Sequence, residues 1–393
     1  MKSNRVACVA IFILASLFLI GCGQNSTPDS RKESKHVSTD IAIELDTLSH
    51  NLARVIGGKE VPLSLQTNWD TSFIKQFVSI TSSKVAKIKE ERLDKMTAWN
   101  QDNLSQNKAE PTSFVFYPFS GGDFIHVNAI YPNASEYLLV AREDVGDIPN
   151  LFTKDAQYVN EYLSDIDTIL RDIYSKSYFI TKNMVEDTKK RTLINGMFPL
   201  ILWAAVNANY EVIDYRFLEM NDSAIALVPY SPATKTDKPE AVEVNLKVVG
   251  SNKKTKVTYI SCDISDDGFV KKGSFLNYLK NKVPSNCNSF VKSASYLMHY
   301  SSFSNIRELL LTKSKFLVQD DTGIPFRYFS QNEWQTSLFG TYEHPVKDFD
   351  SSLFQKNLSN AYKDSVLYKG NINFSLGYHW GSRKQNQLVA VKK

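Results

Sequence analysis

The sequence predicts an α+β fold, a mixed or antiparallel sheet with packed helices, arranged as one large domain or as two intimately packed lobes. Segments with helical spacing of apolar residues and short strand-like apolar runs interleave irregularly, which favours α+β over a regular doubly wound sheet. Of the 393 residues, 42% are hydrophobic and 12% are aromatic. A body of this composition can fill a substantial core.

The expected helices follow from apolar periodicity. The strongest pattern runs from Val159 to Ile173, where apolar side chains recur at i, i+3 and i+4. The same spacing predicts helices at 41–52, 73–96, 269–279 and 305–311. A further segment, 197–206 (MFPLILWAAV), is apolar on all sides but about ten residues long, which predicts a buried helix and not a membrane crossing.

The expected strands are short apolar runs bounded by turn residues. Residues 114–117 form one, with 137–142 as the expected partner. The runs 242–249 and 256–262 flank a polar turn and predict a hairpin. Further strands are predicted at 212–218 and at 224–228, and a closing pair of strands at 372–378 and 387–391.

A Pro- and Lys-rich stretch, Pro229–Pro239, is the best candidate for a domain boundary. It would divide the body into an N-terminal α+β lobe, residues 41–234, and a C-terminal α+β lobe, residues 235–393. A single packed body is the alternative.

The N-terminus has the parts of a secretory signal, a basic start followed by the apolar run Val6–Ile20. The run ends in Leu19-Ile20-Gly21-Cys22, which resembles the lipobox of bacterial lipoproteins. The resemblance implies that residues 1–21 are cleaved, that the Cys22 thiol carries a lipid, and that its new amino group is acylated, typically with palmitate. Gly23, where Asp would resemble an inner-membrane retention signal, favours the outer membrane of the bacterial cell envelope.

Export changes the interpretation of the remaining chain. Residues 22–40, with the lipidated cysteine at their start, are polar and predict a flexible tether. Cleavage lowers the number of Lys and Arg residues from 46 to 44, against 42 acidic residues. The nearly neutral body carries no electrostatic signature of nucleic-acid binding. Cys262 and Cys287 would remain in an oxidising compartment, which favours a disulfide between them over two reduced thiols.

The first candidate site follows the predicted strand at 114–117. Ser120, Gly121 and Gly122 form a glycine turn, and Asp123 is a good N-cap for the helix expected next. Such a turn can bind an anion, but a structural turn plus cap is the simpler interpretation. Asp123 and His126 would share a helix face, as an acid/base pair does. Two groups do not make a metal site, and no metal is predicted.

The second candidate site is Gln319-Asp320-Asp321-Thr322-Gly323. Asp321-Thr322-Gly323 resembles the loop of aspartic proteases, but the chain has no second such loop to supply the other carboxylate of the pair. An ordered acidic turn at the end of a strand is the preferred interpretation. Ser289-Phe290-Val291-Lys292 matches S-x-x-K, but no Lys-Thr-Gly completes a penicillin-binding site.

Two stretches, 117–124 and 319–327, resemble those of a family of uncharacterised bacterial secreted proteins and lipoproteins. The resemblance implies no activity. It implies that these two loops matter to that type of fold.

The expected function is a binding or structural role at the membrane surface, without cofactor, toward an envelope glycan or a protein partner. The alternative is a hydrolase of envelope glycan, peptide or phosphoester. Its catalytic groups would be Asp123, His126, Asp320 and Asp321, and its ligand-binding groups Ser120, Gly121, Gly122 and Arg327. The alternative requires the two turns to converge, because an acid and a base must reach one substrate.

Overall fold

The computed structural model describes residues 43–104, 114–132, 134–178, 192–232, 238–381 and 384–393. The predicted signal segment, Cys22 and the tether lie outside the described residues. From Ala42 to Lys393 the chain forms one compact unit.

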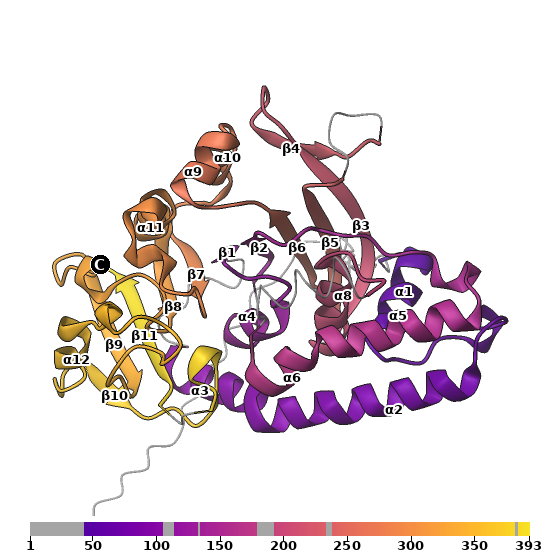
Figure 1. Cartoon of the computed structure of the whole chain (residues 1–393), viewed down its shortest axis with the longest axis horizontal. Coiled ribbons are helices and arrows are strands. Elements are labelled where there is room, and N and C mark those ends of the chain that lie inside the picture. The colour runs from indigo at the N-terminus through magenta and orange to yellow at the C-terminus, as the bar shows by residue number, and fades with distance from the viewer. Residues whose placement is uncertain (1–42, 105–113, 133, 179–191, 233–237, 382–383) are drawn as a thin grey trace, which may run out of the picture. The chain divides into compact units, whose positions relative to one another are not determined.

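In the described part of the chain, eleven strands form a single sheet in the order β10-β9-β11-β8-β7-β1-β2-β6-β5-β3-β4 (Figure 1). The five central strands, β8-β7-β1-β2-β6, are parallel. Antiparallel pairs extend the sheet on both sides. The predicted α+β fold with a mixed sheet is confirmed. The strands are β1 Phe114–Pro118, β2 Glu136–Ala141, β3 Tyr210–Asn221, β4 Ala226–Pro229, β5 Ala241–Val248, β6 Lys254–Ser261, β7 Cys287–Val291, β8 Ser314–Gln319, β9 Trp334–Gly340, β10 Tyr368–Gly370 and β11 Asn386–Lys392.

Helices cover both faces of the sheet, so the central strands are buried on both sides. Successive strand side chains point to opposite faces, and in β1 Val115 and Tyr117 enter one apolar core while Phe116 enters the other. The first core is completed by α1–α6 and α8, and the second by α9–α12. The helices are α1 Thr47–Ile56, α2 Thr71–Ile88, α3 Asp94–Leu104, α4 Phe124–Ile130, α5 Ala156–Ile169, α6 Arg171–Lys176, α8 Phe198–Asn207, α9 Asp266–Lys271, α10 Phe275–Lys282, α11 Ser304–Lys313 and α12 Lys356–Ala361.

The predicted helices are present, and three of them are divided. The expected helix at 159–173 is α5 and α6, which meet at Leu170. The expected helix at 73–96 is α2 and α3, joined by a π-helical turn, Lys89–Leu93. The expected helix at 269–279 is α9 and α10. The apolar segment at 197–206 is α8, whose Leu200, Ile201 and Leu202 are fully buried. Among the described residues, no helix is both long enough and apolar enough to span a membrane.

Two of the predicted strand pairings are confirmed and one is wrong. β1 and β2 are neighbours, in parallel, and β5 and β6 form the expected antiparallel pair. The expected strand at 372–378 is irregular and ends in a short 3-10 turn, Gly377–His379. The strand β11 pairs instead with β8 and β9, segments that lie far from it in the sequence.

The predicted boundary at 234/235 falls between β4 and β5 of the one sheet. Strands from both sides of it alternate across the sheet: β6 pairs with β2, and β7 pairs with β1. The boundary therefore separates no compact units in the structure, and the single-body alternative describes it.

Candidate functional site

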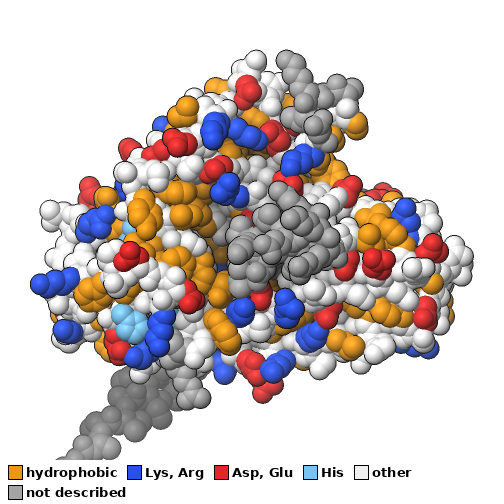
Figure 2. Space-filling view, viewed as in Figure 1, with side chains coloured by type: hydrophobic (Ala, Val, Ile, Leu, Met, Phe, Trp, Pro, Cys, Tyr) orange, Lys and Arg blue, Asp and Glu red, His pale blue; other side chains and the backbone are white. Residues whose placement is uncertain are grey.

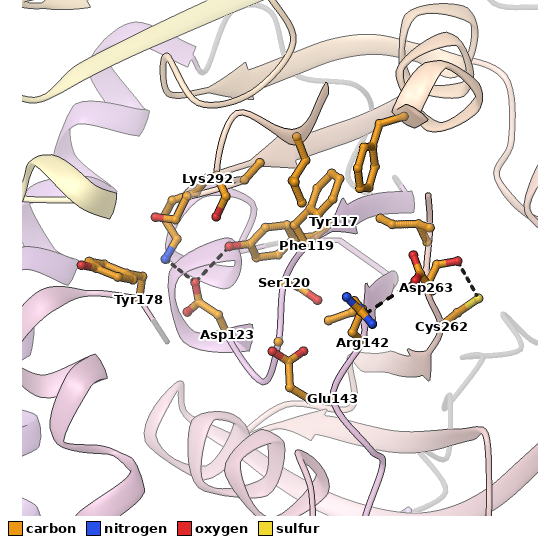
Figure 3. Close-up of a pocket in the computed structure, with 18 of the residues that line it drawn as sticks. Tyr117, Phe119, Ser120, Asp123, Arg142, Glu143, Tyr178, Cys262, Asp263 and Lys292 are labelled. Atoms are coloured by element: carbon orange, nitrogen blue, oxygen red, sulfur yellow. Dashed lines mark hydrogen bonds and ion pairs between the residues drawn. The ribbon is translucent and has the colours of Figure 1, made fainter. Parts of the chain in front are cut away.

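The topology of the sheet creates a crevice at the carboxyl ends of the parallel strands. From β1 the chain passes through α4 to β2 on one side, whereas from β7 it passes through α11 to β8 on the other. Because β1 and β7 are neighbours, the loops that follow them diverge, which is where open parallel sheets bind ligands. A cavity of about 370 Å³ lies there, lined by residues that follow β1, β2, β6 and β7 (Figure 3).

The turn after β1 forms one wall of this cavity. Phe119 and Gly121 adopt positive φ angles, 62° and 52°, which reverse the chain before α4. The Ser120 amide donates to Val140 O at 3.2 Å, which holds the turn against the end of β2. The predicted sequence of strand, glycine turn and helix is present here. The cavity lining includes Ser120, Gly121 and Asp123, but Gly122 packs behind it, against Leu200.

Asp123 occupies the N-cap position of α4, but its carboxylate makes no cap hydrogen bond. The expectation that its side chain caps the helix is wrong, because the carboxylate is hydrogen-bonded to three side chains instead. Lys292 Nζ lies 2.6 Å from Oδ2, Tyr117 OH donates to the same oxygen at 3.1 Å, and His126 Nδ1 lies 2.6 Å from Oδ1. Figure 3 shows Lys292 and Tyr117 converging on it from neighbouring strands.

Burial alone would raise the pKa of Asp123, but its interactions with His126 and Lys292, including a hydrogen bond from each, outweigh that effect and lower the pKa to about 2. Burial lowers the pKa of Lys292, and the Asp123 charge opposes that shift. Both side chains are 2% exposed. Lys292 Nζ also donates to Ser177 O, at 2.5 Å. The pair is a buried, hydrogen-bonded ion pair at the floor of the cavity.

His126 lies behind Asp123 and does not line the cavity. Burial lowers its pKa to about 4, so the ring is neutral near pH 7. Arg92 Nη1, from the π-helical turn, lies 3.4 Å from His126 Nε2. A neutral ring that accepts from Arg92 at Nε2 carries its proton on Nδ1 and donates it to Asp123. The predicted pairing of Asp123 with His126 exists, and its geometry orients the carboxylate.

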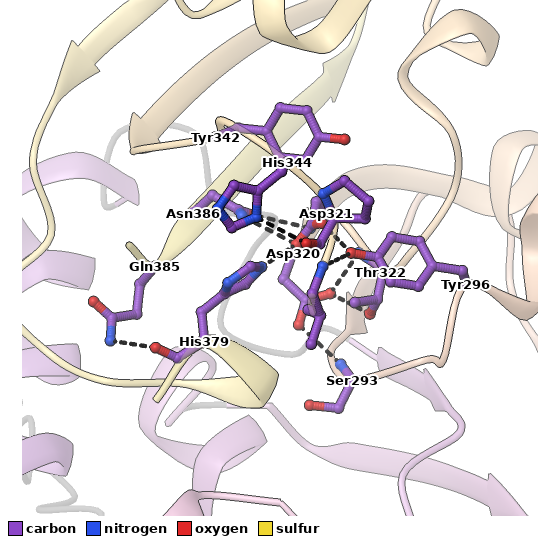
Figure 4. Close-up of polar contacts among 12 residues, drawn as sticks. Ser293, Tyr296, Asp320, Asp321, Thr322, Tyr342, His344, His379, Gln385 and Asn386 are labelled. Carbon is purple, nitrogen blue, oxygen red and sulfur yellow. Dashed lines mark hydrogen bonds and ion pairs between the residues drawn. The ribbon is translucent and has the colours of Figure 1, made fainter. Parts of the chain in front are cut away.

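The predicted acidic turn follows β8, as expected. Asp320 accepts from the amides of Ser293, at 2.9 Å, and Thr322, at 3.0 Å (Figure 4). Burial and the Asp321 charge raise its pKa to about 6. Asp321 accepts from Asn386 Nδ2 at 3.0 Å and contacts His379 Nε2 at 2.9 Å. Tyr296 OH donates to its other oxygen.

Two consecutive residues at the end of β7 join the two predicted turns. The Lys292 side chain contacts Asp123, and the Ser293 amide donates to Asp320. The turns therefore converge, as the hydrolase alternative requires. Asp320 and Asp321, however, line a separate cavity of only about 10 Å³.

Arg327 does not belong to either turn's hydrogen-bond network. Its side chain is exposed and lies against the ring of Tyr328, 5.0 Å from the ring centroid. Arg327 was predicted to bind a ligand together with Ser120, but it is not among the residues that line the cavity.

The cavity also has features that the sequence did not reveal. Its aromatic wall includes Tyr178 and Tyr378, whose ring centroids lie 4.6 Å apart, and Phe119, 6.0 Å from Phe303. The hydroxyl oxygens of Ser120 and Ser293 are buried and have no hydrogen-bond partner among the described residues. Unpartnered buried hydroxyls cost free energy unless a ligand or water satisfies them.

Lys292 is the most important residue that sequence reasoning passed over. The S-x-x-K match placed Ser289 beside it, but Ser289 Oγ contacts Ser314 Oγ at 2.7 Å, within the sheet. A usable signal was the position of Lys292 directly after the apolar pair Phe290-Val291, at the end of a strand. A lysine there can be buried if a carboxylate reaches it.

The predicted disulfide is not formed in this structure. Cys262 and Cys287 are free and buried. Cys262 follows β6 and Cys287 begins β7, with β2 and β1 between those strands. Neighbouring strands lie about 4.8 Å apart, so a bridge would need the sheet to rearrange. Burial raises the pKa of the Cys262 thiol to about 12. A count of free thiols in the denatured, unreduced chain decides whether the pair is oxidised.

Charges of both signs are intermixed over the face seen in Figure 2, without a large patch of one sign. Within the described ranges, no three His, Cys, Asp or Glu side chains gather in an arrangement that could hold a metal ion. The cavity therefore offers aromatic rings, hydroxyls and paired charges for recognition.

No model of a known protein family matches the chain. A comparison with curated proteins also finds no match.

Proposed function

We propose that this chain is a lipid-anchored protein of the bacterial cell envelope that binds a small, uncharged, hydroxyl-rich ligand such as a sugar. The anchor rests on the lipobox-like Leu19-Ile20-Gly21-Cys22 and the polar tether that follows it. Outer-membrane sorting rests on Gly23. The single observation that carries the binding role is the 370 Å³ cavity at the divergence of the β1 and β7 loops, with two unpartnered hydroxyls in its wall.

The ligand class follows from the lining. The volume falls within the range of about 300 to 1,000 Å³ of small-molecule sites. Aromatic rings offer flat apolar faces, and Ser120 and Ser293 offer hydroxyls to the polar edges of a ligand. Two cations, Arg142 and Lys292, face three carboxylates in the lining, and Lys292 is already paired with Asp123. This balance disfavours an anionic ligand.

The binding role predicts that Tyr178→Ala weakens sugar binding about tenfold, equivalent to about 1.4 kcal/mol, because the variant removes an aromatic face from the cavity. The measurement is isothermal titration of N-acetylglucosamine oligosaccharides into the detergent-solubilised chain. Tyr328→Ala is the control, because Tyr328 is 36% exposed and lies outside the cavity. Equal effects of the two substitutions, or no saturable binding by the parent chain, would contradict the proposal.

The anchor predicts that the chain incorporates labelled palmitate in a bacterial host and that Cys22→Ser abolishes the incorporation. The chemical reason is that the Cys22 thiol and the amino group released by cleavage are the only acylation points that the lipobox resemblance implies. The readout is radiolabel or click-label on the protein band after membrane fractionation. Cys8→Ser is the matched control, because Cys8 lies in the segment that is removed. Label retained by Cys22→Ser would refute the anchor.

A second candidate, a hydrolase of envelope glycan, peptide or phosphoester, is favoured by one observation: the two carboxylate turns meet at Lys292-Ser293. Asp320, with a pKa of about 6, has the protonation range of a general acid. Against it, Asp320 does not line the cavity, and Asp123 is held ionised by its donors. Turnover of an envelope polymer that disappears in both Asp320→Asn and Asp321→Asn would establish this function.

A further inference from the structure

A second cavity, of about 400 Å³, lies away from the first one, among α1, α2, α8 and β3. In Figure 1 α1 and α8 lie near β3, and α2 runs along the lower edge of the molecule; α1 contacts both α8 and β3. Its walls are formed by α1, the end of α2, the end of α8 and the start of β3. None of the sequence motifs falls in it.

The charge of this cavity is strongly one-sided. Its lining includes the cations Arg54, Lys59 and Lys89, and one acid, Glu211. Glu211 is already paired with Lys247 at 2.7 Å. Lys59 and Lys89 have no ion-pair partner in the part of the chain that the structure describes. Three cations therefore share a cavity whose acid is committed elsewhere.

The half-buried Lys59 is placed there by the local backbone. Gly58, with φ of +66°, ends α1, and a β-carbon at that position would clash with Thr81. The Gly58 amide donates to Val55 O at 3.0 Å and the Lys59 amide to Arg54 O at 2.8 Å. This is the Schellman pattern, which terminates a helix in a defined geometry. The backbone of Lys59 is thus fixed against that of Arg54, and the Lys59 side chain lines the cavity.

The electrostatics agree with an unbalanced cluster. Burial lowers the pKa of Lys59, and the charges of Lys89 and Arg54 lower it further. No carboxylate opposes these effects. Burial and the Arg54 charge also lower the pKa of His50, which lines the same cavity. The cations repel one another, and a bound anion would relieve the repulsion.

The partial negative charges at the carboxyl ends of the helices do not balance the three cations of this cavity. The carboxyl ends of α1 and α8 face this region, and each is equivalent to about −0.5 charge. Together they offset about one of the three cations and leave a net positive cavity. A polar acceptor is also available, because Asn207 Oδ1 is buried without a hydrogen-bond partner among the described residues. Its Nδ2 is used by Gly57 O and Trp203 O, so the oxygen must accept from elsewhere.

We propose that this cavity binds a phosphate ester whose phosphate lies among Arg54, Lys59 and Lys89 and whose neighbouring hydroxyl donates to Asn207 Oδ1. The chemistry is that of glycerol phosphate, either as a soluble metabolite or as the headgroup of a phospholipid. Cationic side chains without carboxylate partners bind phosphate through charge-assisted hydrogen bonds. The site is independent of the sugar cavity.

The test titrates glycerol 3-phosphate, with glycerol as the phosphate-free control, into the full mature chain in a neutral detergent. We expect saturable binding of glycerol 3-phosphate and none of glycerol. Lys59→Gln/Lys89→Gln should weaken binding at least about tenfold, and Lys59→Arg/Lys89→Arg should retain it. Lys87→Gln is the control, because Lys87 lies near the end of α2, two residues before Lys89, and outside the cavity lining.

A second arm distinguishes the two sources of the phosphate. Dihexanoyl phosphatidylglycerol is compared with dihexanoyl phosphatidylcholine under the same conditions. Preference for the glycerol headgroup that is lost in the Gln double variant assigns the site to a lipid, whereas binding of glycerol 3-phosphate alone assigns it to a soluble ester. Unchanged melting temperatures show that the variants remain folded. The proposal is overturned if neither glycerol 3-phosphate nor dihexanoyl phosphatidylglycerol binds below about 10 mM, or if Lys87→Gln weakens binding as much as the double variant.

Discussion

At the scale of single residues, the floor of the first cavity depends on one ion pair. Asp123 is ionised because Lys292, His126 and Tyr117 all donate to it, and none of the four side chains is more than 2% exposed. A buried ion pair contributes little net stability, but removal of one member leaves the other charge uncompensated. Each member of the pair therefore supplies the countercharge without which the burial of the other would be strongly destabilising.

Lys292→Met should lower the free energy of unfolding by about 3 kcal/mol, because Asp123 would keep only Tyr117 and His126 as donors and would lose its countercharge. Asp123→Asn/Lys292→Met should cost less than the two single substitutions together, since no charge remains buried. Urea denaturation measures all three variants. Lys84→Met is the control, because its pair with Asp167 is about one-third exposed and should cost at most about 1 kcal/mol. Additive costs would show that the pair is not coupled.

The neighbouring acidic turn introduces a pH dependence through His379. Burial lowers the pKa of His379, but the hydrogen bond and charge of Asp321 outweigh it and raise the pKa above 6.5. The folded state then holds the proton more tightly than the unfolded state. The resulting stabilisation is complete below pH 6.5 and is lost as the pH rises through the raised pKa.

His379→Gln should therefore flatten the decrease in unfolding free energy that the parent chain shows above about pH 6.5, because glutamine can still donate to Asp321 but does not titrate. Denaturant titrations across this pH range provide the measurement. His344→Gln serves as the comparison, since His344 is exposed and its ring contacts Pro345 O and not Asp321. If both variants keep the parent slope, the contact does not control it.

At the scale of elements, the sequence predicted those that are built on local apolar patterns. The stripe in α5, the buried α8 and the β5–β6 hairpin all follow from periodicity or a turn between neighbouring runs. The strand β7, with sequence CNSFV, was missed because two of its buried residues, Asn288 and Ser289, are polar. Ser289 is satisfied by Ser314 of β8, a contact that no local pattern reveals.

The same limit applies to the candidate site. Both predicted turns are present, and the first lines the cavity, because each is a local feature at the end of an apolar run. Their junction through Lys292-Ser293 depends on the placement of β7 between β1 and β8. That order is a matter of long-range strand pairing. Lysine is usually exposed, so composition alone does not indicate that this one is buried.

At the scale of the whole molecule, one sheet contains strands from both of the lobes that were predicted from the sequence. The order of the strands brings β6 back to β2 and β7 to β1, so residues from both predicted lobes form the walls of the first cavity. The crevice exists only because the two chain directions separate at β1 and β7. A ligand bound there contacts both halves of the chain.

Expression of residues 43–232 and 238–393 as separate chains should give two polypeptides that do not fold alone. Separation leaves β2 and β1 without their partners β6 and β7, and unpaired central strands expose both apolar surface and backbone groups. Co-expression should restore a soluble complex with the circular dichroism spectrum of the intact chain, because all strand pairs can then form. Size-exclusion chromatography and thermal melts measure both outcomes. A cooperative melt of either half alone would show that the lobes are independent and that the sheet is not the unit of stability.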